Sequence, residues 1–171
     1  AGFEPEFVEI PWSERDSYLM NGTVDCLMSA FAMDGREDNY LWTDSYLSSD
    51  IVVMVGADSP IKSLDEFKEP GGIAVRAGSI AEVSILNKIK SSEYNIDKIR
   101  SYGTFKMATV SFIEGYTDAF VGHEIVLRQL VKDNPGRYRY LENPIMTVHM
   151  GIAFSLNDSR GYEELLNEAL N

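Results

Sequence analysis

The sequence predicts an α/β fold built on open, mostly parallel sheets, because short apolar runs alternate with amphipathic segments of helical period. The first thirty residues already show this order. Residues 6–10 alternate charged and apolar side chains, as in a half-buried strand. Ser13 is expected to cap a short helix that ends at Asn21-Gly22, and residues 24–28 form an apolar strand. A strand, a helix and a strand in so short a stretch are typical of a parallel α/β sheet.

The middle of the chain continues the alternation. An Asp34-Gly35 turn follows the strand at 24–28, and residues 51–55 are an unbroken apolar strand. A short helical turn is expected at 63–67 and a turn at 70–72. Strands are then expected at 73–75, 99–102, 116–121 and 138–141.

Capping and periodicity place the later helices. A Ser-x-x-Glu capping box at Ser79 begins one helix, and Thr104 caps another that ends at Gly115. Their expected apolar faces are Val83, Leu86 and Ile89 in the first, and Met107, Val110 and Ile113 in the second. Further helices are expected over 126–131, stopped by Asn134-Pro135-Gly136, and over 162–169.

Composition narrows the functional classes. A chain of 171 residues forms one domain or two small lobes, and its net charge of −12 disfavours nucleic acid or an anionic membrane surface as a partner. Cys26 is the single cysteine, which excludes an internal disulfide and a cysteine-based zinc site. No apolar run approaches the ~20 residues that span a bilayer and no signal peptide begins the chain, so it is cytosolic or its targeting segment has been removed.

Catalytic and cofactor signatures are absent from the sequence. It contains no Gly-x-Ser-x-Gly, no His-Glu-x-x-His, no P-loop and no dinucleotide-binding glycine pattern. His123 and His149 are not at metal-ligand spacing. We therefore expect a protein that is not an enzyme and that has no cofactor, no metal and no catalytic residue.

An ordered set of motifs covers nearly the whole chain. A turn and Arg36 are followed by Thr43-Asp44-Ser45-Tyr46 and the strand at 51–55, and four further motifs come in order: 63–67, 73–79, 117–121 and 151–154. This set resembles extracellular solute-binding proteins of family 3, the polar-amino-acid binding proteins of bacterial ABC importers and the related sensor domains of membrane receptors. The resemblance implies a periplasmic-binding-protein-like fold (type II), in which two lobes close on a ligand.

The same resemblance implies the domain plan and the partners. Lobe I would comprise 1–54 and 149–171, and lobe II 55–148. The family's first strand and helix have no counterpart here, so lobe I is expected to be incomplete, and either to be covered by another chain, for example in a dimer, or to be unstable. The expected location is extracytoplasmic, with the parent protein anchored in a membrane. The expected partners are a small carboxylate ligand and a membrane permease or the rest of a receptor.

Three loops beyond the carboxyl ends of strands are the candidate site, at residues 31–36, 76–81 and 122–124. In the family resemblance they hold an amino acid, whose carboxylate would meet the Arg36 guanidinium, backbone N–H groups near residues 30–32 and the helix N-terminus at Ser79. Arg76 either meets a ligand side chain or pairs with surface acids, and Phe31 either stacks on a ligand or belongs to the core. The predicted ligand-binding residues are Phe31, Ala32, Arg36, Arg76, Ser79, Ile80 and His123.

This sequence departs from the family pattern at three of these positions. Ala32 stands where the family has a hydroxyl residue, and Ile80 where it has threonine or glycine. His123 stands where an aspartate receives the ligand's ammonium group, and an imidazole supplies no counter-charge. Glu124 could substitute for it, or His123 could simply cap the following helix. The alternatives are a ligand without the usual ammonium contact, a degenerate sensor or interaction module with no small ligand, and a dehydratase-like enzyme on the same fold.

Overall fold

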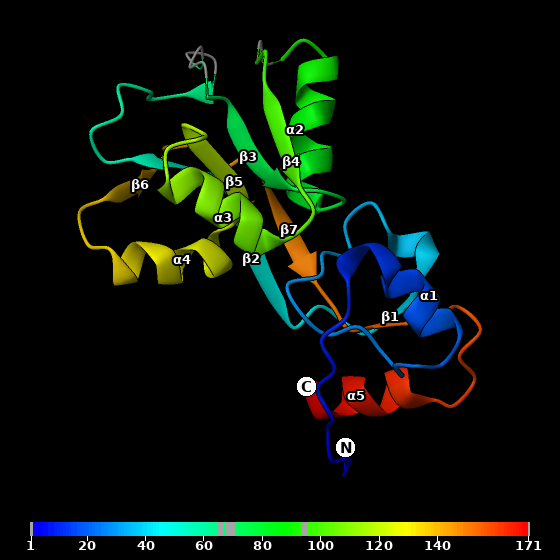
Figure 1. Ribbon diagram of the computed structural model, residues 1–171. Coiled ribbons are helices and arrows are strands. Elements are labelled where there is room, and N and C mark those ends of the chain that lie inside the picture. Colours follow the sequence, from blue (N-terminus) through cyan, green and yellow to red (C-terminus); the bar gives the residue numbers. More distant parts are fainter. Residues whose placement is uncertain (1, 65–66, 68–70, 94–95, 171) are drawn as a thin grey trace. The chain divides into compact units, whose positions relative to one another are not determined.

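The chain forms two compact units in the computed structural model, which describes residues 2–64, 67, 71–93 and 96–170 (Figure 1). The first unit comprises Ala1–Ser48 and Val148–Asn171, and the second comprises Ser49–Thr147. The expected turns at 63–67 and 70–72 lie partly outside the described residues.

The second unit is built on a mixed sheet. Its strand order is β4-β3-β5-β2-β6, and β7 also pairs with β2. The strands are β2 (Leu47–Gly56), β3 (Ile73–Arg76), β4 (Ile99–Tyr102), β5 (Ala119–His123), β6 (Tyr138–Tyr140) and β7 (Met146–Met150). β3 runs parallel to both β4 and β5, whereas β2 is antiparallel to β5 and β6. The expected parallel sheet is therefore confined to one half, and the long strand β2 introduces the antiparallel pairs.

Three helices cover this sheet: α2 (Ile80–Lys90), α3 (Phe105–Ile113) and α4 (Glu124–Asp133). α3 and α4 pack on one face of the sheet around Phe112, Phe120 and Leu127 (Figure 1). Val52 and Met54 of β2 join the same cluster because alternate residues of a strand point to the same face. The apolar run in β2 is buried throughout, as expected for a strand covered on both faces.

The capping predictions for α2 and α3 are confirmed. Ser79 Oγ accepts a hydrogen bond from Glu82 N at 3.2 Å, and Thr104 Oγ1 accepts one from Met107 N at 3.1 Å. The Glu82 carboxylate reaches back and accepts a hydrogen bond from Gly78 N, at 2.7 Å, just before the helix start.

The expected apolar faces of these two helices are wrong. Val83 and Leu86 of α2 are exposed, and so are all three residues of the expected face of α3. The residues that pack inward are mostly small: Ile80, Ala81, Ser84 and Ile85 in α2, and Ala108, Ser111 and Phe112 in α3. Small side chains let a helix lie close to a sheet, so a stripe of alanine and serine can face the core in place of the more apolar one.

The first unit has little regular structure. It contains a 3₁₀ turn at Trp12–Glu14, α1 (Arg15–Met20), a second 3₁₀ turn at Glu37–Asn39 and α5 (Tyr162–Leu170). Its strands are β1 (Leu41–Trp42) and β8 (Ala153–Phe154), which pair antiparallel. The helix expected before Asn21 is present, but Ser13 lies inside the 3₁₀ turn and does not cap it.

Two strands expected in this unit are wrong. Residues 6–10 are in no strand and are almost entirely exposed, and residues 24–28 contribute only an isolated bridge between Leu27 and Ala153. A strand needs partners for its backbone groups along its length, and the described residues give the 24–28 segment that single bridge. The core of this unit is a cluster around Leu19, Leu27 and Phe31, with Trp12 and Trp42 packed against it.

Candidate functional site

Phe31 is the base of the candidate site in the first unit. Only 1% of this residue is exposed. Its ring contacts those of Trp12, Tyr40 and Trp42, with centroid distances of 4.9, 5.3 and 5.0 Å. Of the two roles left open for Phe31, the structure shows the core one. The ring therefore supports the residues above it.

Arg36 lies on this aromatic base. The turn at Asp34-Gly35 is present, with Gly35 at a φ of 72°, and it aims the following arginine back across Phe31. The Arg36 Cζ atom is 5.4 Å from the Phe31 ring centroid, and Nη1 donates to Ala32 O at 3.2 Å. Trp42 Nε1 donates to Arg36 O at 3.1 Å, which holds the backbone. The guanidinium is thus positioned by its own loop.

Burial lowers the pKa of Arg36 from its usual value, and the nearby Arg15 guanidinium lowers it further. An arginine keeps its charge across the physiological range even so. The direction of the shift means that this cation is partly deprived of solvent and lies close to a second positive charge. Both conditions strengthen its attraction to an anion.

A cavity of about 330 Å³ opens beside Arg36 within the first unit. It is lined by residues of α1, of the second 3₁₀ turn and of the segment after β8: Arg15, Asp16, Leu19, Met20, Arg36, Asn39, Tyr40, Ser155, Leu156 and Asn157. Tyr40 donates its hydroxyl hydrogen to Asp16 Oδ1 at the wall. Burial and this hydrogen bond raise the pKa of Tyr40. The sequence prediction included Arg36 and missed the rest of the lining.

Ala32 contacts the candidate site through its carbonyl oxygen, which accepts the hydrogen bond from Arg36. It is buried and forms an isolated bridge with Met150, so its side chain adds no polar group where the family has a hydroxyl residue. The structure therefore brings Phe31, Ala32 and Arg36 together in the first unit. The other four predicted residues lie in the second unit.

Arg76 and Ser79 lie at the junction of β3 and α2. Ser79 is buried, and its hydroxyl donates to Arg76 O at 2.6 Å while it accepts from Glu82 N. The single hydroxyl proton is therefore used within the turn. Ile80 is buried at the first position of α2. Any anion contact at this helix start would be made by backbone N–H groups.

His123 is the last residue of β5, and the loop expected at 122–124 is wrong. Gly122 pairs with Val52 and His123 with Ile51, and α4 begins at once with Glu124. Since β5 and β3 are parallel neighbours, their carboxyl ends lie side by side, and Arg76 and His123 are the last residues of these two strands. His123 holds the N-cap position of α4, but its side chain makes no cap hydrogen bond.

Glu124 is engaged within its own helix. Its carboxylate forms an ion pair with Arg128, with 2.7 Å between Oε2 and Nη2 and a second hydrogen bond to Nε at 3.1 Å. This i, i+4 pair lies on the surface of α4. The arrangement disfavours Glu124 as the substitute for the family's aspartate.

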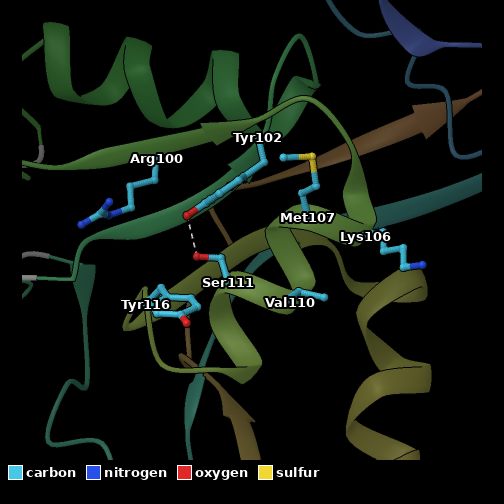
Figure 2. Close-up of a pocket in the computed structure, with 7 residues that line it drawn as sticks. All are labelled: Arg100, Tyr102, Lys106, Met107, Val110, Ser111 and Tyr116. Carbon is cyan, nitrogen blue, oxygen red and sulfur yellow. Dashed lines mark hydrogen bonds between the residues drawn. The ribbon is translucent and has the colours of Figure 1, made fainter.

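A second cavity, of about 520 Å³, lies between α3 and the edge strand β4 (Figure 2). It is lined by Arg100, Tyr102, Lys106, Met107, Val110, Ser111 and Tyr116. The Tyr102 and Ser111 hydroxyls hydrogen-bond to each other at its base (Figure 2). It is larger than the cavity beside Arg36, but it contains none of the predicted site residues. We place the candidate site at Arg36 because its cavity, unlike this one, includes a predicted site residue, whose guanidinium lies over the buried Phe31 ring.

Within residues 2–64, 67, 71–93 and 96–170, no group of three histidine, cysteine or acidic residues could hold a metal ion. In the same part of the chain, no helix is long and apolar enough to cross a membrane.

The family model for bacterial extracellular solute-binding proteins, family 3, matches residues 1–171. The chain belongs to this family. The resemblance in the motifs is thereby confirmed, and so is the α/β periplasmic-binding-protein-like fold class. A search of curated proteins found no match.

Solved structures of amino-acid-binding proteins share the fold. Holo ArgBP from T. maritima has 22% identity and a TM-score of 0.81, with 99% of this chain and 73% of that chain covered. The arginine-, lysine-, histidine-binding protein ArtJ from Geobacillus stearothermophilus has 23% identity and a TM-score of 0.81, with 99% and 72% covered. The ancestral amino acid-binding protein AncCDT-1, a precursor of cyclohexadienyl dehydratase, has 22% identity and a TM-score of 0.78, with 96% and 69% covered.

Proposed function

We propose that this family member binds a small carboxylate-bearing ligand, an amino acid or a related acid, and that Arg36 anchors the carboxylate. The observation that carries the proposal is the position of the Arg36 guanidinium, which lies over the buried Phe31 ring and lines a cavity. A planar guanidinium offers two parallel donors that match a carboxylate, and aromatic support keeps it oriented.

The second unit would supply the remaining contacts. We propose that lobe I (1–54 and 149–171) and lobe II (55–148) close on the ligand, as solute-binding modules do. The α2 N-terminus would offer backbone N–H groups to an anion. Arg76 and His123, which end two neighbouring parallel strands, would face the rest of the ligand.

The usual ammonium contact is weakened in this proposal. His123 replaces the expected aspartate, and Glu124 is paired with Arg128. The ligand would therefore be held chiefly through its acidic part. The protein would act without catalysis, outside the cytoplasm, as the receptor of an importer or as the sensor half of a membrane protein, and a permease or the rest of that receptor would be its partner.

An enzyme is the second candidate function. One solved structure of the same fold is described as a precursor of cyclohexadienyl dehydratase. Conversion of prephenate-like acids by the purified protein would favour this alternative. A degenerate module that binds no small molecule is the third candidate, favoured by Ala32, Ile80 and His123.

A thermal-shift screen tests the proposal. The purified protein is heated with amino acids and small carboxylates, alongside Arg36→Ala and a matched control, Arg137→Ala, which removes an exposed arginine of the second unit. A ligand at a hundredfold excess over its dissociation constant adds about 2.7 kcal/mol of stability. We expect carboxylates to raise the midpoint of the wild type and of Arg137→Ala, but not of Arg36→Ala. A folded wild type that responds to no carboxylate would contradict the proposal.

A further inference from the structure

The cavity between α3 and β4, here called the α3–β4 groove, has an apolar side that is open to solvent. Met107 and Val110 of α3 line it and are 55% and 47% exposed. Tyr116, which follows the helix, also lines it and is 67% exposed. Met107 and Val110 belong to the apolar face that the periodicity of α3 predicts, and this face does not pack on the sheet. Exposed apolar side chains gathered in one groove are typical of a surface that another molecule covers.

β4 forms the other side of the groove and is the outermost strand of its sheet. Among the described residues its only partner strand is β3. The carbonyl oxygens of Lys98 and Tyr102 accept hydrogen bonds from the β3 side. Since the residues of a strand bond alternately to its two sides, Ile99 and Ser101 direct their backbone groups to the outer edge. An extended peptide that ran along this edge would add a strand to the sheet.

Two cations lie on opposite sides of the apolar residues of the groove, Arg100 on β4 and Lys106 on α3 (Figure 2). Within the part of the chain that the structure describes, the Arg100 side chain makes one hydrogen bond, from Nε to Gly71 O at 2.6 Å, and Lys106 makes no ion pair. None of the lining residues is acidic, although the chain has 27 acidic and 15 basic residues. The groove is therefore complementary in charge to an acidic occupant.

The arrangement of the two cations favours an extended occupant. A small anion would contact one cation at a time, because the apolar residues lie between Arg100 and Lys106 (Figure 2). A second copy of this chain, paired through its own β4 edge, would bring like charges together with no acidic lining residue to neutralise them. A peptide from another protein can reach both cations while its backbone pairs with β4.

From these observations we propose that the α3–β4 groove binds an extended acidic peptide segment of another protein by strand addition to β4. Arg100 and Lys106 contact carboxylates at the two ends of the segment, and Met107 and Val110 contact apolar side chains between them. The inference goes beyond the proposed function, because none of the residues that line the groove belongs to the candidate ligand site.

Fluorescence polarisation with labelled peptides and the 171-residue chain tests the inference. The probe is Glu-Thr-Val-Thr-Val-Thr-Glu with blocked ends, which places both acids and both valines on one face of a strand. Two matched peptides carry glutamine or lysine in place of glutamate, and a second set carries phenylalanine in place of valine. We expect the acidic peptides to bind about tenfold more tightly than the glutamine peptides, and the lysine peptides to bind most weakly. The inference fails if no acidic peptide binds, or if the glutamine or lysine peptides bind equally well.

Methylation of the peptide's backbone nitrogens separates strand addition from simple charge attraction. In an added strand, alternate N–H groups face β4 and the others face away. We therefore expect methyl groups on one alternate set of nitrogens to abolish binding and those on the other set to leave it nearly unchanged. Equal effects of the two sets would overturn strand addition.

Variants assign binding to the groove. Lys106→Gln should weaken the acidic peptide about threefold, whereas Lys132→Gln, which removes an exposed lysine of α4 outside the groove, should not change its affinity. Val110→Asp should abolish binding, and Val83→Asp on α2 is the control, because both valines are exposed. Wild-type affinity in both Lys106→Gln and Val110→Asp would overturn the assignment.

Other occupants of the groove would be recognised by two further measurements. Self-association in analytical ultracentrifugation that Val110→Asp abolishes would assign the groove to a second copy and overturn the inference. Competition by N-acetylglutamate at the same concentration as the peptide would make it a site for small anions, with the same consequence. Failure of every carboxylate in the thermal-shift screen would refute the proposed function and leave this inference standing.

Discussion

Replacing Phe31 by alanine would test whether its ring is the structural base of the first unit. Phe31 is 1% exposed and contacts three aromatic rings and two guanidinium groups. Removing a buried phenyl group costs about 3–5 kcal/mol of unfolding free energy, because the apolar burial is lost and a cavity remains. A typical domain has only about 5–15 kcal/mol in total. We therefore expect a severe loss of stability.

Urea denaturation followed by tryptophan fluorescence measures this loss, since Trp12 and Trp42 both contact Phe31. Phe31→Leu keeps most of the volume, so it should lose less than half as much stability as Phe31→Ala. Phe7→Ala is the control, because Phe7 is 84% exposed and its loss should change stability by no more than about 0.5 kcal/mol. Equal effects of Phe31→Ala and Phe7→Ala would refute the assignment of Phe31 to the core.

Two further predictions follow from the backbone and from a buried hydroxyl. Gly72→Ala should destabilise the second unit by about 2 kcal/mol or more, since Gly72 has a φ of +82° and an added Cβ atom would lie 2.6 Å from Lys98 O. Gly136→Ala is the control, because Gly136 has a positive φ but an added Cβ atom would meet no clash there, so this variant should lose less stability. Urea denaturation of the two variants measures the difference. The raised pKa of Tyr40 stabilises the fold below the usual tyrosine pKa of about 10, and this stability is lost as the pH rises through the higher folded value. Tyr40→Phe should therefore show a smaller loss of stability between neutral and strongly alkaline pH than the wild type, and an identical loss would contradict the assignment.

Features that depend on neighbouring residues were predictable from the sequence. The capping box at Ser79, the Thr104 cap and the turn at Gly35 each involve groups a few residues apart. The strand at 99–102 and the helix that ends before Asn134 were also placed closely. Such features form through hydrogen bonds within one turn, so the chain encodes them directly.

Features that depend on a distant partner were not predictable. The spacing of Met107, Val110 and Ile113 describes an apolar helix face, but α3 turns Ala108 and Phe112 toward the sheet. Residues 6–10 have the alternation of a strand and form none. Periodicity identifies a face or a strand pattern, whereas packing against another element decides whether it is used.

The candidate site likewise has a part that the sequence predicted and a part that depends on contacts between distant segments. The sequence by itself determined the family and the α/β class, because these rest on ordered motifs, and it predicted the local turn that precedes Arg36. Only the tertiary structure decided that Arg15, from a helix remote in sequence, lies over the same Phe31 ring and lines the same cavity. The physical reason is that burial of one aromatic ring between separate segments brings their charges together, and no spacing along the chain encodes that contact.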